Sequence, residues 1–140
     1  MYIERALEPL VRRYSENFKI VAVTGPRQVG KTTMLKHLME EEAESGVDRV
    51  YVQTAKEDPA LFLQRYRPPV LIDEIQKAPE LLPYIKMIVD ERDDCGSVWI
   101  TGSQPLHLMK AVSESLDGRV GIVEMLGLSH SEVAGTPSEP

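Results

Sequence analysis

The chain has 140 residues, with 16 Lys and Arg against 22 Asp and Glu and a formal net charge of −6. This length suits one domain with a full hydrophobic core, and 42% hydrophobic with 27% charged residues excludes collagen-like, coiled-coil and wholly disordered proteins. The acidic balance does not indicate nucleic-acid binding, although it does not exclude a local basic patch. The chain has one cysteine, a charged start and no long apolar run, so we expect a cytoplasmic protein without a membrane segment.

The first part of the chain alternates between helical and extended patterns. Apolar residues at helical spacing predict a helix over 3–14, in which Pro9 either causes a kink or delays the start. The β-branched run 18–23 predicts a strand buried on both faces. A helix is expected over 31–44, and we interpret its acidic run, 40–44, as a solvated helix end.

The same alternation continues to the end of the chain. Asp58 and Pro59 form a helix start, and Pro83 is tolerable only in the first turn of its helix. The further strands expected are 49–53, 70–73, 97–101 and 119–125, and the further helices are 58–63, 79–92 and 106–116. Strands alternating with helices predict an α/β fold of three layers around a five-stranded, mostly parallel sheet.

A glycine-rich segment, Gly25-Pro26-Arg27-Gln28-Val29-Gly30-Lys31-Thr32-Thr33, stands between the first strand and the first long helix. It fits G-x-x-x-x-G-K-[ST], the pattern of a phosphate-binding P-loop. The glycines let the loop curl with its N–H groups inward, and the helix N-terminus adds partial positive charge. We expect Lys31 to reach the β- and γ-phosphates and Thr32 to bind Mg²⁺. The alternative is a glycine-rich turn that happens to precede a lysine.

Two acidic residues, Asp73 and Glu74, follow the apolar strand 70–73. Beside a P-loop this arrangement indicates a Walker B site, in which Asp73 holds Mg²⁺, mostly through water. Glu74, one residue further on, can polarise an attacking water, which favours hydrolysis over phosphoryl transfer to another acceptor. The alternative is a polar strand end that starts a turn.

Polar side chains also end the fourth strand, where ligands of open α/β sheets bind. Thr101 or Ser103 could contact the γ-phosphate or the attacking water, and the pattern does not choose between them; a plain turn is the alternative. Arg119 either satisfies carbonyl groups at a helix end or reaches a γ-phosphate, in the second case on a neighbouring subunit. His37, His107 and His130 show no ligand spacing, so no metal site beyond Mg²⁺ is expected.

Four segments in this order, 25–33, 71–76, 101–104 and 114–119, resemble motifs of the prokaryotic AAA-superfamily ATPases. Within that superfamily the chain is similar to a bacterial and archaeal group whose AAA domain precedes a nuclease-like C-terminal region. The resemblance implies the branch of P-loop proteins that uses an added catalytic glutamate, with strand order 5-1-4-3-2. It also implies a core over 1–133, with an N-terminal helix over 1–16, a nucleotide-binding part over 17–133, and a tail or further region from 134 to 140.

For the site, the resemblance implies that Lys31 and Thr32 bind nucleotide and Mg²⁺ and that Asp73 and Glu74 form the Walker B pair. It further implies a sensor within 101–103 and a candidate arginine finger at Arg119, which would need a homo-oligomer if it acts on a neighbouring subunit. The function expected is Mg-ATP binding and slow hydrolysis, with ATP over GTP resting on the resemblance. The alternatives are a nucleotide-binding fragment without turnover and a P-loop phosphotransferase.

Overall fold

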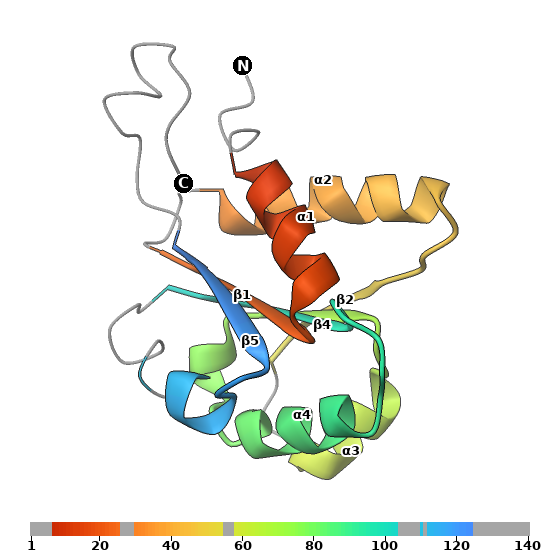
Figure 1. The fold of residues 1–140 in the computed structure, drawn as a ribbon. Helices are drawn as coiled ribbons and strands as arrows, with labels where there is room; N and C mark the ends of the chain where they lie inside the picture. Colours follow the sequence, from red (N-terminus) through yellow and green to blue (C-terminus); the bar gives the residue numbers. More distant parts are fainter. Residues whose placement is uncertain (1–6, 26–29, 55–57, 104–109, 111, 125–140) are drawn as a thin grey trace.

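The computed structural model describes residues 7–25, 30–54, 58–103, 110 and 112–124. Its helices and strands alternate along the chain (Figure 1). The helices are α1 (Glu8–Asn17), α2 (Lys31–Glu44), α3 (Pro59–Arg65) and α4 (Leu81–Asp90), with a short 3-10 helix, η2, at Ile75–Lys77. The strands are β1 (Ile20–Thr24), β2 (Val50–Gln53), β3 (Val70–Asp73), β4 (Val98–Gly102) and β5 (Val120–Glu124).

The five strands form one sheet in the order β2-β3-β4-β1-β5, and every pairing in it is parallel. This result confirms the three-layer α/β fold and the order 5-1-4-3-2 read from the opposite edge. The register pairs Thr24 with Gly102 and Gln53 with Asp73, so the carboxyl ends of four strands meet at one edge of the sheet. Open α/β sheets generally bind their ligands at this edge.

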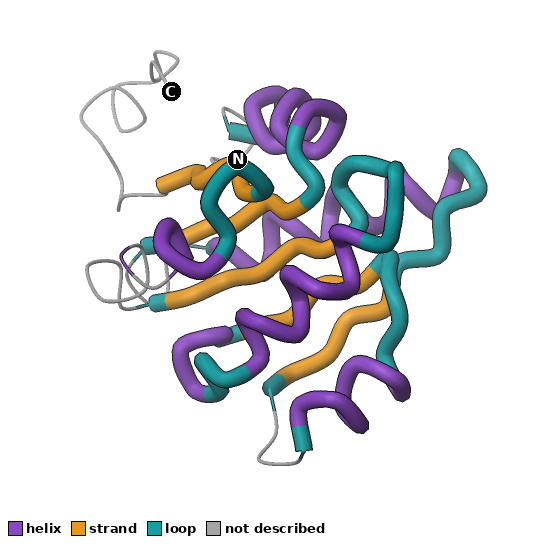
Figure 2. The backbone as a smooth tube through the Cα atoms, turned by 60° about the horizontal axis from the view of Figure 1, so that its bottom comes forward, coloured by secondary structure: helices purple, strands orange, loops and turns teal. Residues whose placement is uncertain are grey.

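Helices cover both faces of the sheet, with α1 and α2 on one side and α3 and α4 on the other (Figures 1 and 2). Successive side chains of a strand pack alternately against the helices on the two faces, because the side chains of a strand have a period of two residues. In β1, Ile20 and Ala22 pack in the core between the sheet and helices α3 and α4. Val21 and Val23 pack in the core between the sheet and helices α1 and α2. The prediction of a strand buried on both faces is therefore confirmed.

Local signals for helix starts agree with the structure. Pro9 lies in the first turn of α1, so the helix starts late rather than kinking, and Pro83 lies in the first turn of α4. Asp58 caps α3, because its Oδ1 accepts hydrogen bonds from the N–H groups of Ala60 at 2.9 Å and Leu61 at 3.3 Å. Residues 3–6 of the first predicted helix and most of 106–111 lie outside the described residues.

Residues 40–44 form the end of α2, as predicted, and two of the acidic residues there also form ion pairs. Glu42 forms a two-point ion pair with Arg49, whose side chain is only 3% exposed. Glu41 pairs with Arg12 of α1 and also faces His37. Arg12 and Arg49 lie outside α2, so a run of like charges in the sequence could not reveal these two ion pairs. Among the described residues, no helix is long and apolar enough to cross a membrane.

Candidate active site

The glycine-rich segment joins β1 to α2 at the carboxyl edge of the sheet. Gly25 and Gly30 both have positive φ, 153° and 90°, and Gly30 is the N-cap of α2 in the left-handed conformation, which favours glycine. Residues Pro26, Arg27, Gln28 and Val29 lie outside the described residues. The turn at Gly30 sends the chain directly into α2, with Lys31 and Thr32 in the first turn and exposed Thr33 after them.

Lys31 is nearly buried, at 6% exposure, and its ammonium group turns back toward the start of the loop. Its Nζ donates a hydrogen bond of 2.8 Å to the carbonyl oxygen of Gly25. This contact places a positive charge at the carboxyl end of β1, beside the start of α2. A loop that must attract phosphate oxygens needs this combination of a positive charge and a helix N-terminus.

Asp73, 9% exposed at the end of β3, gathers hydroxyl groups from three other elements. Its Oδ1 accepts hydrogen bonds from Thr32 of α2 at 3.0 Å and from Thr101 of β4. Its Oδ2 accepts one from Tyr51 of β2 at 2.7 Å. Burial is the main cause that raises the pKa of Tyr51, and the hydrogen bond to Asp73 is the second cause. The Tyr51 hydroxyl therefore stays protonated and remains a donor at neutral pH.

The pair Thr32 and Asp73 fits a Mg²⁺ ion. Both offer oxygen, which is the ligand atom that Mg²⁺ prefers, and the two oxygens lie 3.0 Å apart. One hydroxyl and one carboxylate leave most of the coordination sphere to water and phosphate oxygens, as is usual for this ion. The donor set is therefore compatible with the metal predicted from the sequence.

Among the described residues other than glycine, Glu74 is the one with a left-handed backbone, at φ 58° and ψ 56°. Such a conformation costs about 1–3 kcal/mol unless its surroundings hold it. Here the N–H of Glu74 donates to Thr101 Oγ1 at 2.9 Å, and its carbonyl oxygen accepts from Thr54 Oγ1 at 3.2 Å. Two neighbouring strands thus fix the backbone that aims the Glu74 side chain.

The carboxylate of Glu74 is held by two side chains. Its Oε2 accepts hydrogen bonds from Ser103 Oγ at 3.1 Å and from Gln76 Nε2. Gln76 Nε2 also donates to Ser103 at 2.9 Å, while Gln76 Oε1 is buried and no partner among the described residues reaches it. Ser103 therefore lies beside Glu74, whereas Thr101 lies between Asp73 and the Glu74 backbone.

Arg119 lies away from this group. It precedes β5, and because β5 runs parallel to β1 the residue stands at the opposite edge of the sheet from the glycine-rich segment. Its guanidinium forms hydrogen bonds of 2.6 and 3.0 Å with the Asp90 carboxylate. That hydrogen bond lowers the pKa of Asp90 and raises the pKa of Arg119. Within one chain, Arg119 is therefore not part of the site.

Three contributors to the site were not assigned roles from the sequence: Tyr51, Thr54 and Gln76. Tyr51 and Thr54 come from β2 and the residue after it, and only the pairing of β2 with β3 brings them to Asp73 and Glu74. Gln76 carried a usable signal, because it follows Glu74 by two residues in a stretch already singled out. Its role still depends on η2, which turns its amide back toward the carboxylate.

The strand order, the glycine turn before α2 and the acidic pair at the end of β3 define a P-loop nucleoside triphosphatase fold. A family model described as an AAA domain matches residues 17–134, and the chain belongs to that family. It is similar to two proteins described as uncharacterized, one from Mycobacterium bovis and one from Mycobacterium tuberculosis. Each is 34% identical over 135 residues, which is 92% of this chain but 30% of the relative. The chain thus spans about a third of the length of these curated relatives.

Proposed function

We propose that this chain binds Mg-ATP and hydrolyses it slowly. The observation that carries the proposal is the hydrogen-bonded series Thr32–Asp73–Thr101–Glu74, which joins the start of α2 to the ends of β3 and β4. It links a candidate metal site to a candidate base. Membership of the AAA family supports nucleotide binding and ATP use.

In the proposed reaction, Lys31 exchanges the Gly25 carbonyl for the β- and γ-phosphates. Mg²⁺ at Thr32 and Asp73 would neutralise phosphate charge. Glu74 accepts a hydrogen bond from the attacking water. Ser103 keeps the Glu74 carboxylate in place. The N–H groups of the loop and Lys31 stabilise the charge that develops on the γ-phosphoryl oxygens.

Two alternatives follow from the same fold. A nucleotide-binding piece without turnover is supported by the chain's share of its relatives, since residues needed for hydrolysis could belong to the remainder. The resemblance to the group with a nuclease-like C-terminal region suggests what that remainder contains. A phosphotransferase is disfavoured by the water-polarising position of Glu74. Use of ATP is consistent with the expected cytoplasmic location.

Lys31→Ala tests the proposal. We expect Mg-ATP to raise the melting temperature of wild type, because a ligand at ~100 times its Kd stabilises by about 2.7 kcal/mol. The variant should need at least about tenfold more ATP for the same shift, and its turnover should be lost. Lys86→Ala, an exposed lysine on α4, is the matched control and should behave as wild type. Equal melting shifts in wild type and Lys31→Ala would contradict phosphate binding by the loop.

Arg119 carries a separate proposal, a homo-oligomer in which this residue completes the site of a neighbouring subunit. Wild-type turnover per chain should then rise with protein concentration, and Arg119→Ala should remove that rise. Stability should change little, since the lost ion pair with Asp90 is at the surface. If turnover per chain is independent of concentration and unchanged in Arg119→Ala, the arginine has only structural contacts, with the Asp90 carboxylate and the Asp117 carbonyl oxygen.

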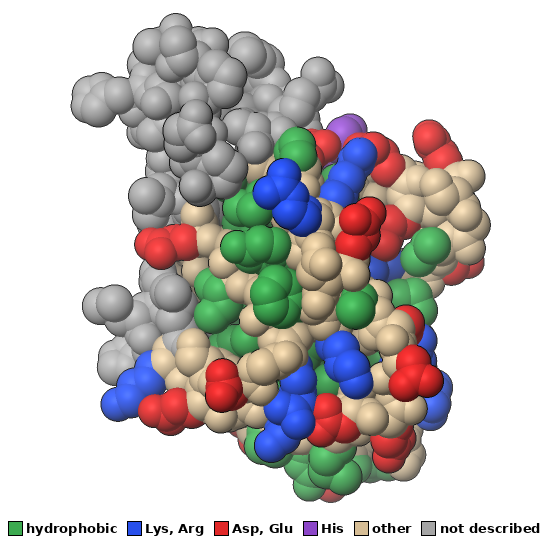
Figure 3. All heavy atoms as spheres, viewed as in Figure 1, with side chains coloured by type: hydrophobic (Ala, Val, Ile, Leu, Met, Phe, Trp, Pro, Cys, Tyr) green, Lys and Arg blue, Asp and Glu red, His purple; other side chains and the backbone are tan. Residues whose placement is uncertain are grey.

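The face of the molecule that carries α1 does not indicate nucleic acid as a partner. On the face that carries α1, Lys and Arg side chains are interspersed with Asp and Glu (Figure 3). A mixed surface of this kind lacks the continuous basic stripe that backbone contacts to nucleic acid require.

A further inference from the structure

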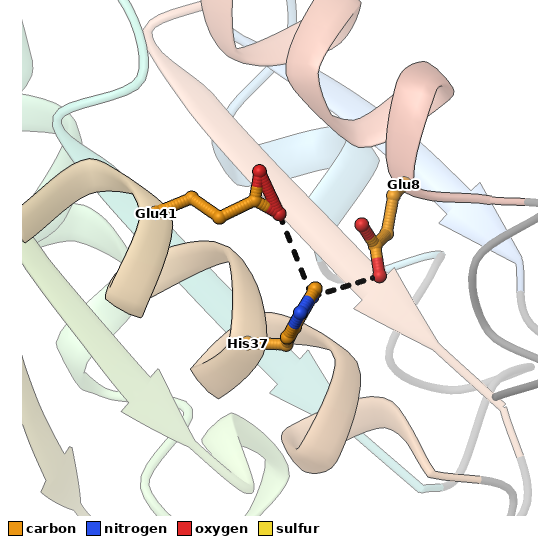
Figure 4. Close-up of side chains that lie close together, drawn as sticks. All are labelled: Glu8, His37 and Glu41. Carbon is orange, nitrogen blue, oxygen red and sulfur yellow. Dashed lines mark hydrogen bonds and ion pairs between the residues drawn. The ribbon is translucent and has the colours of Figure 1, made fainter. Parts of the chain in front are cut away.

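Three metal-binding side chains converge on the side of the sheet that carries α1 and α2, apart from the site of the proposed function. Glu8 comes from the first turn of α1, and His37 and Glu41 lie one turn apart on α2 (Figure 4). One ligand atom from each lies within 4.8 Å of the other two. The spacing between histidines does not reveal this group, because two of its three members are glutamates.

A proton on the His37 ring cannot satisfy both neighbouring carboxylates. The Nδ1 atom of His37 lies 3.0 Å from an oxygen of Glu8 and 3.5 Å from an oxygen of Glu41. One ring nitrogen carries at most one hydrogen, so it cannot donate a good hydrogen bond to both carboxylates. The Glu8 side chain is also only 7% exposed, so water contributes little to stabilising its charge.

One cation could bind all three groups, because their ligand atoms lie within 4.8 Å of one another. Zinc binds histidine nitrogen at about 2.0–2.1 Å and carboxylate oxygen at about 2.0–2.2 Å in a tetrahedron, which separates neighbouring ligand atoms by roughly 3.4 Å. The two nitrogen–oxygen separations here, 3.0 and 3.5 Å, lie on either side of that value. The mixed nitrogen and oxygen set suits zinc better than Mg²⁺, which prefers oxygen alone.

We propose that Glu8, His37 and Glu41 form a zinc site that ties α1 to α2. His37 and Glu41 are 40% and 39% exposed, so an ion can enter from solvent, which also provides the fourth ligand. Two carboxylates and the neighbouring Arg12 leave one net negative charge for the ion to neutralise. The other charged residues of this surface hollow, Arg13 and Glu16, oppose each other in sign.

The neighbouring arginine is compatible with this role. Arg12 binds Glu41 through Oε2, while the oxygen of Glu41 that faces His37 is Oε1. The arginine therefore orients the carboxylate and leaves its other oxygen directed at the ion, as outer hydrogen bonds to metal ligands commonly do. Because α2 begins at Lys31, the ion would fix the position of α1 against the helix that starts at the phosphate loop.

Zinc titration of the purified chain without nucleotide tests the proposal, so the result does not depend on ATP binding or hydrolysis. Calorimetry should give one zinc per chain with a Kd below about 100 μM, and Co²⁺ should produce the visible absorption of a four-coordinate site. The melting temperature should rise with zinc, and a large excess of Mg²⁺ should not displace it. Lys31→Ala should bind zinc as wild type does.

Variants locate the ion. His37→Ala and Glu41→Gln change half-exposed side chains and should each weaken zinc binding at least about tenfold, and Glu8→Gln should do the same. Glu40→Gln, an exposed acid on the same helix, is the matched control and should bind as wild type. Melting without metal verifies that each variant is folded. Binding weaker than 100 μM, or binding that survives both His37→Ala and Glu41→Gln, would overturn the site.

Discussion

Glu74→Gln is expected to lower ATP turnover by at least about 100-fold while ATP binding stays within about twofold of wild type. Gln keeps the size of the side chain and can still accept the hydrogen bonds from Ser103 and Gln76 through its amide oxygen. It lacks the negative charge that polarises the attacking water. The backbone contacts to Thr101 and Thr54 do not involve the side chain, so the left-handed turn should persist.

Steady-state phosphate release and the melting shift with Mg-ATP, measured on the same samples, separate the two effects. Glu80→Gln is the matched control, because Glu80 is an exposed acid that precedes α4 and lies outside the site. Turnover within threefold of wild type in Glu74→Gln would exclude this residue as the base. A melting shift with no turnover in wild type itself would favour the alternative of a nucleotide-binding piece.

Arg49→Ala is expected to lower the free energy of unfolding by about 3–5 kcal/mol, as removal of one partner from a buried ion pair usually does. The Arg49 guanidinium binds both carboxylate oxygens of Glu42 and donates to the Gly96 carbonyl at 2.6 Å. It also lies 3.8 Å from the centre of the Trp99 ring. Loss of the side chain leaves the partly buried Glu42 carboxylate without this cation.

Urea denaturation of wild type and variant measures the difference. Arg49→Lys keeps the charge but not the planar group that binds two oxygens at once, so its loss should be intermediate. Arg13→Ala removes an exposed arginine of α1 and should change the free energy of unfolding by no more than about 0.5 kcal/mol. A loss under 1 kcal/mol in Arg49→Ala would show that the pair with Glu42 contributes little net stability.

Much of the fold could be predicted because its signals are local. Alternating apolar strands, the cap at Asp58 and the prolines in first turns act through neighbours in sequence, and these predictions agree with the structure. The strand order followed from a family resemblance rather than from the residues, because strand pairing depends on contacts between distant segments. The helix ends shifted by a few residues, as expected where frayed turns compete with loops.

The sequence by itself determined which residues could carry phosphate chemistry: the glycine turn with Lys31 and Thr32, and the acidic pair Asp73 and Glu74. Their positions depend on local structure, because the glycine turn leads into the start of a helix and the acidic pair stands at the end of a strand. Only the tertiary structure decided which side chains surround them, such as Tyr51 on Asp73, because parallel pairing brings separate strands to one edge.

The tertiary structure also separated residues that the sequence left ambiguous. Ser103 contacts the Glu74 carboxylate. Arg119, which belongs to the last of the four motifs, instead lies at the opposite edge of the sheet and pairs with Asp90. Glu42 and Glu41, adjacent in one acidic run, have different partners because successive residues of a helix face different directions. The sign of a charge can be read from the sequence, but its partner depends on how the helices and the segments around them pack.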